Sequence, residues 1–596
     1  MALPRLGHPH RRARVLFIGV CIVLSLFAAQ LLRLQALDAS AMAAEALGSR
    51  QITHTLKAMR GDILDRSGVP LATSVERYDI SVDQRVVCLY EQKPAPSGCG
   101  GTDPQAAAGV ERAVLALAPV LGLDAATLRE KLTGTRGFAY VKKGVEPEVW
   151  RTVSALDIPG ILATRTSDRL YPAGSVGASV VGFVGADNVT PRGGLELRLN
   201  TQLTGTDGSV TYQRDPSGRQ IATSEVDRVP AVDGQDVRLT LDRDLQWQAE
   251  QLLDAKVAES GALSGTLVVM KRDGEILALA NAPSFDPNDT SRSAMKNLAN
   301  RALSDVYEPG STGKVMTFAA ALEEGVITPS TPMTVKGHIK RSTKVFHDSH
   351  DHPPERLTAA GVLAKSSNVG TIMIGEKIAP KTMHDYLTHF GIGQPSGLNF
   401  PGESRGILAP AKDWSGSQRY TVLFGQGLSV NAVQAAGVFQ TIANDGVRMP
   451  PRLIEGVQRP DGSVDEAAPA SGVRVVSAAT AATVRQMLEG VVSADGTAPE
   501  AKIPGYRVAG KTGTAQRFDP GCGCYRGYTA SFIGMAPADH PQLIVAVTLQ
   551  RPVNGHYGGS LAGPVFKQIM SYALQKLQIP PTGSKAPRIS LVPGDR

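Results

Sequence analysis

The chain has 596 residues, of which 42% are hydrophobic and 20% are charged, and its formal net charge is +7. This composition is typical of a globular protein of about two to four domains and excludes a long disordered block. Lysine and arginine form no dense cluster with interleaved aromatic residues, so the sequence predicts no nucleic-acid partner.

An uncharged apolar run spans residues 15–32, and four arginines precede it: Arg5, Arg11, Arg12 and Arg14. Its length is close to the minimum that spans a bilayer, and upstream arginines favour a cytoplasmic N-terminus. A cleaved signal peptide is the alternative, because Ala28 and Ala29 suit cleavage, but its apolar core is typically about 7–15 residues. We therefore expect a cytoplasmic tail over 1–14, a transmembrane helix over 15–34 and an extracytoplasmic remainder in the cell membrane.

The chain contains five cysteines. Cys21 lies in the apolar run, and the others form two close pairs: Cys88 with Cys99, and Cys522 with Cys524. An oxidising exterior allows the first pair to close a disulfide. One glycine separates the second pair, which is tight for a disulfide without excluding one. Neither spacing matches a zinc site.

Residues 35–241 are predicted to form one elongated mixed domain without an obvious catalytic cluster. A helical stalk is expected at 36–47, helices at 107–132 and 147–156, and strands between 208 and 240. The segment 60–72 reads as strand, turn and strand. Its charges fit either a solvated face or an ion-pair network between segments, and the sequence leaves both open.

Residues 242–580 are predicted to form a second domain, followed by a flexible tail at 581–596. A helix at 242–260 precedes two apolar strands around Asp273-Gly274, which is a hairpin signal. A largely helical middle runs to about residue 500, and strands return at 506–510, 528–535 and 543–550 before a helix at 563–578. The fold class is therefore α+β, with an antiparallel sheet packed between helices.

The first candidate for chemistry is Ser311 with Lys314. A helix is predicted to open at Ser311, so the two side chains, three positions apart, share a face. A serine hydroxyl needs a base to become a nucleophile, and a lysine that burial keeps neutral can be that base. A helix cap beside a solvated lysine is the commoner explanation of one such motif.

The second candidate is Ser366 with Asn368. In an extended loop these side chains would point to the same side, where a hydroxyl can pass a proton and an amide can hold a substrate carbonyl. A helix cap is again the commoner explanation of an isolated Ser-Ser-Asn.

The third candidate is Gly510-Lys511-Thr512-Gly513-Thr514. With Gly505 it matches the phosphate-binding loop, but the flanking segments are rich in turn residues and supply no strand before it or helix after it. We therefore expect an edge strand whose lysine, threonines and backbone amides line a cleft for an anionic substrate.

Three histidines and two aspartates lie within His347–His352. Their spacing follows neither zinc nor calcium patterns, so a polar loop is favoured over a metal site.

The order S-x-x-K, S-x-N and K-T-G resembles the signature of the penicillin-recognising serine acyl-transferases. Further segments look like those of class B penicillin-binding proteins: Arg60–Arg66, Arg169–Gly174, Asn300–Ser311 and Phe424–Ser429. The resemblance extends from about residue 55 to 575 and is strongest for the division-specific (septal) type, with the elongation type as the close alternative. One departure is Gly313, where the family more often has a bulkier apolar residue.

The resemblance implies a single-pass, membrane-anchored peptidoglycan D,D-transpeptidase with a non-catalytic pedestal (dimerisation-type) domain. Ser311 would attack a D-Ala-D-Ala stem peptide, and Lys314 would accept its proton. Lys511 would lower the pKa of Lys314, while Thr512, Gly513 and Thr514 would bind the terminal carboxylate. The remaining implied roles are the oxyanion hole at the backbone N–H groups of Ser311 and Thr514, proton relay by Ser366 and substrate orientation by Asn368.

The resemblance also implies partners and alternatives. β-Lactams would acylate the same serine, no metal or organic cofactor would be needed, and the substrate would be a stem peptide on a lipid-linked precursor. A polytopic glycosyltransferase and other division proteins would be partners. The alternatives are a D,D-carboxypeptidase, a β-lactamase and a non-catalytic β-lactam-binding sensor; the sequence shows no E-x-x-L-N loop for the second and only a short cytoplasmic segment for the third.

Overall fold

A computed structural model describes residues 9–37, 40, 42, 51–92, 99, 103–213, 221, 224–225, 227–459, 461–468, 470–519 and 521–594. The chain divides into two compact units. The first comprises 1–58, 76–167 and 206–233, and the second comprises 59–75, 168–205 and 234–596. Most of the predicted stalk at 36–47 lies outside the described residues.

The second unit contains two segments that the sequence analysis assigned to the pedestal. Residues 59–75 and 168–205 contribute Ile63, Tyr171 and Leu195 to the same hydrophobic core as the C-terminal residues. Burial of these apolar side chains therefore joins them to the larger unit. The boundary predicted at residue 241 stays a prediction.

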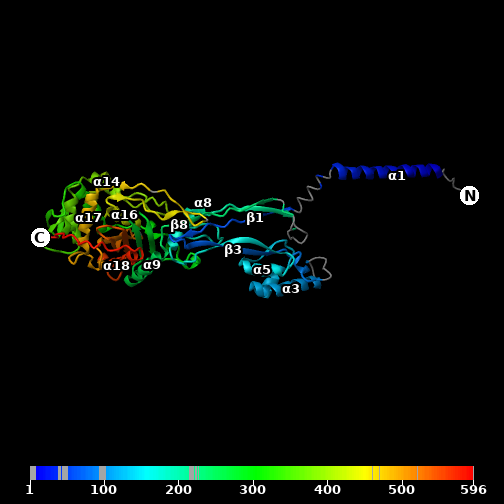
Figure 1. Cartoon of the computed structure of the whole chain (residues 1–596), viewed down its shortest axis with the longest axis horizontal. Coiled ribbons are helices and arrows are strands. Elements are labelled where there is room, and N and C mark those ends of the chain that lie inside the picture. Colours follow the sequence, from blue (N-terminus) through cyan, green and yellow to red (C-terminus); the bar gives the residue numbers. More distant parts are fainter. Residues whose placement is uncertain are drawn as a thin grey trace. The chain divides into compact units, whose positions relative to one another are not determined.

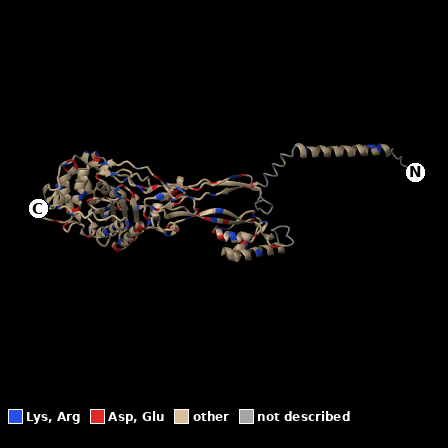
Figure 2. Ribbon diagram, viewed as in Figure 1, with Lys and Arg blue, Asp and Glu red and all other residues tan. Residues whose placement is uncertain are grey.

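Helix α1 (Pro9–Leu32) continues as a π-helical turn η1 (Arg33–Leu37). Among the described residues it is the one helix that is long and apolar enough to cross a membrane. Figure 2 shows its basic residues near the N-terminal end and no charged residue along its middle.

After α1, the described part of the first unit combines antiparallel strands with helices. Strands β1 (Gln51–Leu56), β6 (Gly208–Gln213) and β7 (Asp227–Val229) form one sheet, and the later part of β3 (Pro70–Val82) pairs with β4 (Ala139–Val145) and β5 (Ile161–Leu170). The helices are α3 (Pro104–Leu121), α4 (Ala125–Leu132) and α5 (Pro147–Ala155). Asp103 and Asp124 cap the first two by accepting backbone N–H bonds.

The core of the first unit contains one of the two cysteine pairs. Cys88 is fully buried and is joined to Cys99 by a disulfide. Leu117 of α3 and Leu128 of α4 are also fully buried in this core. The cross-link therefore lies at the 3-10 turn Val87–Leu89, which contacts α3.

In the described part of the second unit, five strands form an antiparallel sheet in the order β10-β9-β21-β20-β19. Their bounds are Ile276–Ala282 (β10), Ser264–Lys271 (β9), Leu543–Gln550 (β21), Cys524–Ala536 (β20) and Ala509–Asp519 (β19). Residues of β9, β10 and β21 are buried almost without interruption, so helices cover both faces. Strand β19 forms one edge, as the sequence predicts.

Two pairs of helices cover this sheet. Helices α9 (Arg243–Ser260) and α18 (Gly558–Lys576) contact each other and the sheet, as do α16 (Ala432–Ala443) and α17 (Ala478–Glu489). Figure 1 shows α16 and α17 above α9 and α18 in this view. The predicted arrangement of an antiparallel sheet between helices is confirmed.

The helices between the first and last strands of this sheet include α10 (Arg301–Ser304), α11 (Lys314–Glu323), α12 (Ala359–Ala364), α13 (Asn368–Gly375), α14 (Pro380–His389) and α15 (Gln418–Thr421). Three strand pairs interrupt them: β11 (Pro332–Val335) with β14 (Glu355–Thr358), β12 (His338–Arg341) with β13 (Lys344–His347), and β15 (Val447–Arg448) with β18 (Val473–Arg474). These strands have two to four residues, which is too short for a periodicity signal.

The second unit also contains a smaller set of strands and short helices. The strands are β2 (Ile63–Leu64), the start of β3, β8 (Asp236–Leu239), β16 (Ile454–Gln458) and β17 (Val464–Glu466). The helices are α6 (Ala178–Val181), α7 (Gly194–Arg198) and α8 (Asn200–Leu203).

A buried ion-pair network joins these short elements. The carboxylate of Glu196, fully inaccessible, accepts a bond from Nε of Arg60 at 2.7 Å and from Nε of Arg169 at 2.7 Å. Nη1 of Arg169 also donates to Oγ of Ser74 at 3.0 Å. The charges at 60–66 thus take part in an ion-pair network between segments. This is the second of the two alternatives that the sequence left open.

Glu196→Gln should destabilise the second unit strongly, because two buried guanidinium groups would lose their anionic partner. The expected loss is about 3–5 kcal/mol in the free energy of unfolding, measured by denaturation of the full chain in detergent. Glu111→Gln is the control, since Glu111 pairs with Arg129 at the surface and its loss should change little. Equal effects of the two substitutions would contradict a structural role for the network.

Candidate active site

Ser311 lies in a 3-10 turn, Gly310–Gly313, directly before α11. The helix predicted to open at Ser311 begins at Lys314 instead. Gly310 explains the tighter turn: its φ of +52° favours glycine, and a Cβ there would lie 2.8 Å from Cβ of Ala515 in β19. The nucleophile candidate is therefore pressed against the edge strand of the sheet.

Gly313 is the residue that departs from the family pattern. A Cβ at this position would lie 3.0 Å from Cα of Gly425, which is tighter than an ordinary contact. The backbone N–H of Gly310 donates to the carbonyl oxygen of Gly425 at 2.9 Å, so the loop at 424–429 packs closely on the turn. Close packing by this loop therefore accounts for the glycine.

Ser366 has a left-handed backbone, with φ of +61°, between the end of α12 and the start of α13. Asn368 is the first residue of α13, which Ser367 caps by accepting the N–H of Gly370 at 2.9 Å. The extended loop considered for these residues is wrong, and the helix cap given as its alternative is present at Ser367. A left-handed residue followed by a helix start, not strand alternation, directs these side chains.

The loop of histidines and aspartates anchors this helix start. Oδ1 of Asp348 accepts the N–H of Asn368 at 2.6 Å, and Oδ2 accepts the hydroxyl of Ser367 at 2.7 Å. Nε2 of His352 lies 3.0 Å from Oδ2 of Asp348, and this carboxylate raises the pKa of His352. Nδ2 of Asn368 donates to the carbonyl oxygen of His347 at 3.0 Å. This loop therefore acts as a cap for α13.

Lys314 and Lys511 meet at one hydroxyl group. Nζ of Lys314 lies 3.2 Å from Oγ of Ser366 and donates to its carbonyl oxygen at 2.5 Å. Nζ of Lys511 lies 2.9 Å from the same Oγ and also donates to Oγ1 of Thr512 at 3.2 Å. The three motifs are thus brought together by contacts between residues 52 and 145 positions apart.

Both lysines are fully buried, which penalises their charged forms. Burial lowers the pKa of Lys314 to about 7, and the nearby Asp348 carboxylate opposes this shift. Burial also lowers the pKa of Lys511 well below its usual value, with a further contribution from Lys314. The dominant cause for Lys314 is therefore desolvation rather than the charge of Lys511, which the sequence analysis had invoked.

Strand β19 supplies the other wall of the site. Register with β20 places Thr512 opposite Phe532 and Thr514 opposite Ala530. Oγ1 of Thr512 lies 2.8 Å from Oγ1 of Thr497, and Oγ1 of Thr514 accepts the N–H of Gly558 at 3.2 Å. Both hydroxyl groups are therefore oriented by neighbouring elements.

Gly513 permits close packing behind this strand. A Cβ at Gly513 would lie 2.3 Å from Oγ of Ser531 and 3.0 Å from the carbonyl oxygen of Pro309. The K-T-G segment and the turn that carries Ser311 therefore touch through their backbones.

A cleft of about 680 Å³ opens over these groups. Its lining includes Ser311, Ser366, Asn368, Thr512 and Thr514. Lys314 and Lys511 lie beneath its floor. In the described part of the chain the hydroxyl of Ser311 makes no hydrogen bond, so the turn, rather than a bond to Lys314, sets its position.

Comparison with known proteins agrees with this geometry. Residues 265–571 match the penicillin-binding protein transpeptidase domain, and residues 55–239 match the penicillin-binding protein dimerisation domain. The chain belongs to the penicillin-binding proteins. The resemblance inferred from the motifs is confirmed.

Relatives of this penicillin-binding protein cover most of its length. It is 39% identical to penicillin-binding protein PbpB of Mycobacterium tuberculosis, over 96% of this chain and 86% of PbpB. It is 33% identical to peptidoglycan D,D-transpeptidase FtsI of Escherichia coli, over 88% of this chain and 86% of FtsI. A crystal structure of penicillin-binding protein 3 of M. tuberculosis complexed with aztreonam is similar at 34% sequence identity, with a TM-score of 0.69. The match covers 90% of this chain and 99% of the chain in that structure.

Sequence reasoning missed several residues that orient the penicillin-binding protein's site. Thr497 supports Thr512 and lies between helices, where no motif marks it. Asp348 was noticed as part of a metal-like cluster, whereas its contacts are with the start of α13. An aspartate before a Ser-Ser-Asn helix start is a capping signal, but Asp348 lies 19 positions before Ser367, which hides the signal.

Lys314→Met should stabilise the folded protein at pH 7, by up to about 4 kcal/mol at about 1.4 kcal/mol per pKa unit. The folded pKa of Lys314, about 7, lies below its ordinary value of 10.5, so the unfolded state binds more protons between these values and stability rises with pH there. Lys314→Met should therefore also weaken the rise in Tm between pH 7 and 10.

Lys365→Met is the matched control, since Lys365 is exposed beside the same cleft. Thermal unfolding of the full chain across this pH range measures both variants. If the Tm of Lys314→Met at pH 7 were lower than that of the wild type, the buried amine of Lys314 would not destabilise the fold.

Proposed function

We propose that this protein is a serine-type peptidoglycan D,D-transpeptidase that crosslinks stem peptides through an acyl-enzyme on Ser311. The observation that carries the proposal is the convergence of two buried lysines on the hydroxyl of Ser366, at the floor of the cleft that Ser311 and Thr514 line. The activity printed for the relative FtsI, peptidoglycan D,D-transpeptidase, supports the same conclusion.

Acylation begins with attack of Oγ of Ser311 on the carbonyl carbon between the two terminal D-alanines. Lys314 is the general base, because burial holds the pKa of its amine near 7 and leaves a large neutral fraction at physiological pH. The backbone N–H groups of Ser311 and Thr514 form the oxyanion hole, and one such donor typically contributes about 10²–10³ in rate. Contact between the turn and β19 supports this assignment.

The terminal carboxylate of the donor peptide binds the hydroxyl groups of Thr512 and Thr514. Both line the cleft, and the glycine between them leaves room for the close backbone packing behind it. Lys511 is buried beneath them and bonded to Oγ1 of Thr512, so it acts on the carboxylate through its hydrogen-bond network.

Ser366 passes protons between the lysines and the amines that leave or attack. As the D-alanine amine departs, the Ser366 hydroxyl gives it a proton and receives one from a lysine. An amine of a second stem peptide then takes the acyl group and completes the crosslink. Asn368 lines the cleft with Nδ2 bonded to His347, which leaves Oδ1 to accept a substrate N–H.

The cellular setting follows from α1 and the relatives. We infer that α1 anchors the protein in the membrane with its arginine-bearing N-terminus in the cytoplasm and the catalytic unit outside. β-Lactams acylate the same serine; the related penicillin-binding protein 3 is complexed with aztreonam. A septal role, with a polytopic glycosyltransferase and other division proteins as partners, fits the relative FtsI and is tested by localising a fluorescent fusion to the septum or the side wall.

Ser311→Ala should abolish the covalent penicillin adduct and peptide crosslinking together. Mass spectrometry of the full chain treated with penicillin should place the adduct on Ser311, with a lifetime of minutes or longer. Turnover within seconds would instead identify a hydrolase, and crosslinking by Ser311→Ala would overturn the assignment of the nucleophile.

The acylation rate should rise with pH and level off above a midpoint near 7. Only the neutral amine of Lys314 accepts a proton, and burial sets its pKa at about 7. Asp348→Asn should move the midpoint to lower pH, because the Asp348 carboxylate raises the pKa of Lys314. Fluorescent-penicillin labelling from pH 5.5 to 8.5 measures both profiles, and a flat profile would exclude Lys314 as the base.

A further inference from the structure

Glu308 lies three residues before Ser311 and connects three elements. Its Oε1 accepts the N–H of Gly427 at 2.9 Å and the hydroxyl of Tyr525 at 3.1 Å. Its Oε2 is buried and makes no hydrogen bond with any described residue. The carboxylate thus faces protein on both oxygens, and the catalytic roles assigned above leave it without a function.

The bond to Gly427 fixes the loop that packs on the nucleophile turn. This loop contacts the turn again where Gly425 accepts the N–H of Gly310, and a Cβ at Gly425 would lie 2.1 Å from the carbonyl oxygen of Gly310. Gly310, which directly precedes Ser311, and Gly313 therefore both pack against this loop. Any shift of the loop would move the Ser311 hydroxyl and the N–H that faces the oxyanion.

The bond to Tyr525 attaches the same turn to the end of the β19–β20 hairpin. Tyr525 lies opposite Phe518 in the register, and their rings contact edge to face with centroids 5.9 Å apart. Strand β19 carries Lys511 to Thr514 farther along. Glu308 thereby joins the turn of the nucleophile to the strand of the carboxylate site at a second point, away from the contact at Gly310.

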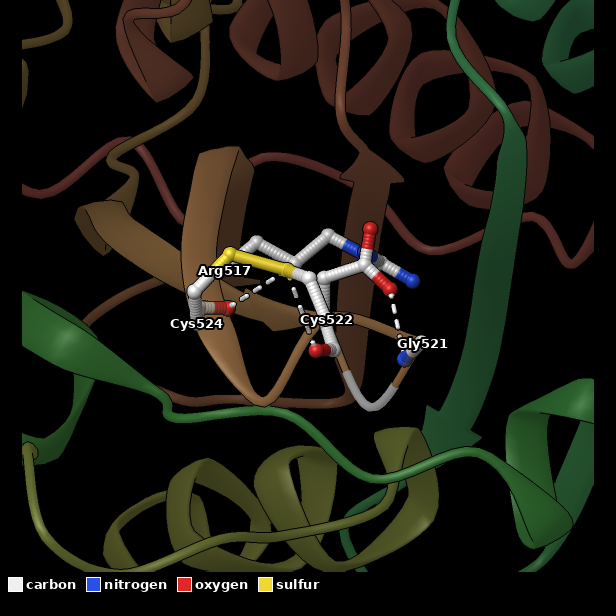
Figure 3. The surroundings of a disulfide bond; sticks show 5 residues. Arg517, Gly521, Cys522 and Cys524 are labelled. Carbon is white, nitrogen blue, oxygen red and sulfur yellow. Dashed lines mark hydrogen bonds and ion pairs between the residues drawn. A yellow bond between two sulfur atoms is a disulfide. The ribbon is translucent and has the colours of Figure 1, made fainter.

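A disulfide between Cys522 and Cys524 closes the end of this hairpin. Figure 3 shows the sulfur–sulfur bond within the connection between the strands, with Arg517 and Gly521 beside it. Oδ1 of Asp519 accepts the N–H of Gly521 at 3.0 Å, so the connection also has its own hydrogen bond. Cys524 directly precedes Tyr525, and the cross-link therefore restricts the backbone that presents the tyrosine hydroxyl.

We propose that Glu308 is a positioning residue for acyl transfer, and that with Tyr525 and the Cys522–Cys524 disulfide it forms a latch that holds Ser311 against β19. The proposal rests on the function proposed above. A dithiol that reduces the bond transfers two electrons and two protons, yields two cysteine thiols and becomes a disulfide itself. Reduction releases the constraint on Tyr525 and weakens the latch.

Stopped-flow acylation of the full chain in detergent by a fluorescent penicillin tests the proposal. Tyr525→Phe removes one hydroxyl at a half-exposed side chain and should slow the acylation step about 3–10-fold, the range for loss of an ordinary hydrogen bond. Glu308→Ala should slow it more, and Glu308→Gln should recover most of the rate because its amide oxygen still accepts both bonds. The non-covalent dissociation constant of penicillin and Tm should change little.

A double-mutant cycle separates a latch from independent effects. The combined Glu308→Ala and Tyr525→Phe variant should be no slower than Glu308→Ala, because the same bond is removed twice. The proposal would be overturned if the combined variant were slowed by the product of the two single effects, or if Glu308→Ala were acylated at the wild-type rate. A uniform loss of Tm and penicillin binding would likewise overturn it, since that pattern reflects general destabilisation.

The disulfide is tested with matched cysteine variants. Dithiothreitol should slow wild-type acylation to the rate of the double variant Cys522→Ser/Cys524→Ser. It should leave the acylation rate of Tyr525→Phe almost unchanged. The Cys88→Ser, Cys99→Ser variant should keep the response, because that pair lies in the first unit. No response in the wild type would overturn the role of the disulfide. Failure of the proposed function is distinct, since it would appear as labelling of Ser311→Ala.

Discussion

The structure depends on placing two amines where water cannot reach them. Lys314 and Lys511 are among the largest fully buried side chains in the described chain. Nζ of each lies within hydrogen-bonding distance of the same oxygen, Oγ of Ser366. Two ammonium groups at this spacing in a dry interior would repel strongly, so burial favours at least one neutral amine. That neutral amine is what a serine needs to become a nucleophile.

The carboxylate of Asp348 limits how far burial lowers the pKa of Lys314. Desolvation lowers the pKa of Lys314 to about 7, and Asp348 acts in the opposite direction. A base is most effective when its pKa lies near the working pH, because a lower pKa gives a weaker base and a higher one gives a smaller neutral fraction. Asp348 also caps α13, which orients Ser366 and Asn368. One side chain therefore contributes to both the geometry of the site and the basicity of Lys314.

The sequence predicted the three motifs and the sheet between helices because both are local patterns. Ser311 and Lys314, or Lys511 and Thr512, are recognisable from neighbours a few positions away. The contacts made by Asp348, Thr497 and Glu196 span 15 to 136 residues, and no local pattern encodes them. The backbone of Ser366 was mispredicted for a different, local reason: Ser366 is the left-handed residue in the short junction between α12 and α13.

The glycines around the site connect the local sequence motifs to the long-range contacts. Gly310, Gly425 and Gly513 each occupy a position where a Cβ would overlap a neighbouring segment. Without side chains there, the turn, the loop and the edge strand approach until their backbones touch. Such contact fixes backbone N–H groups more firmly than side-chain packing can, and an oxyanion hole gains from donors that need no reorganisation during the reaction. The chain thus accepts the conformational cost of glycine, about 0.5–1 kcal/mol per residue, in exchange for a preorganised site.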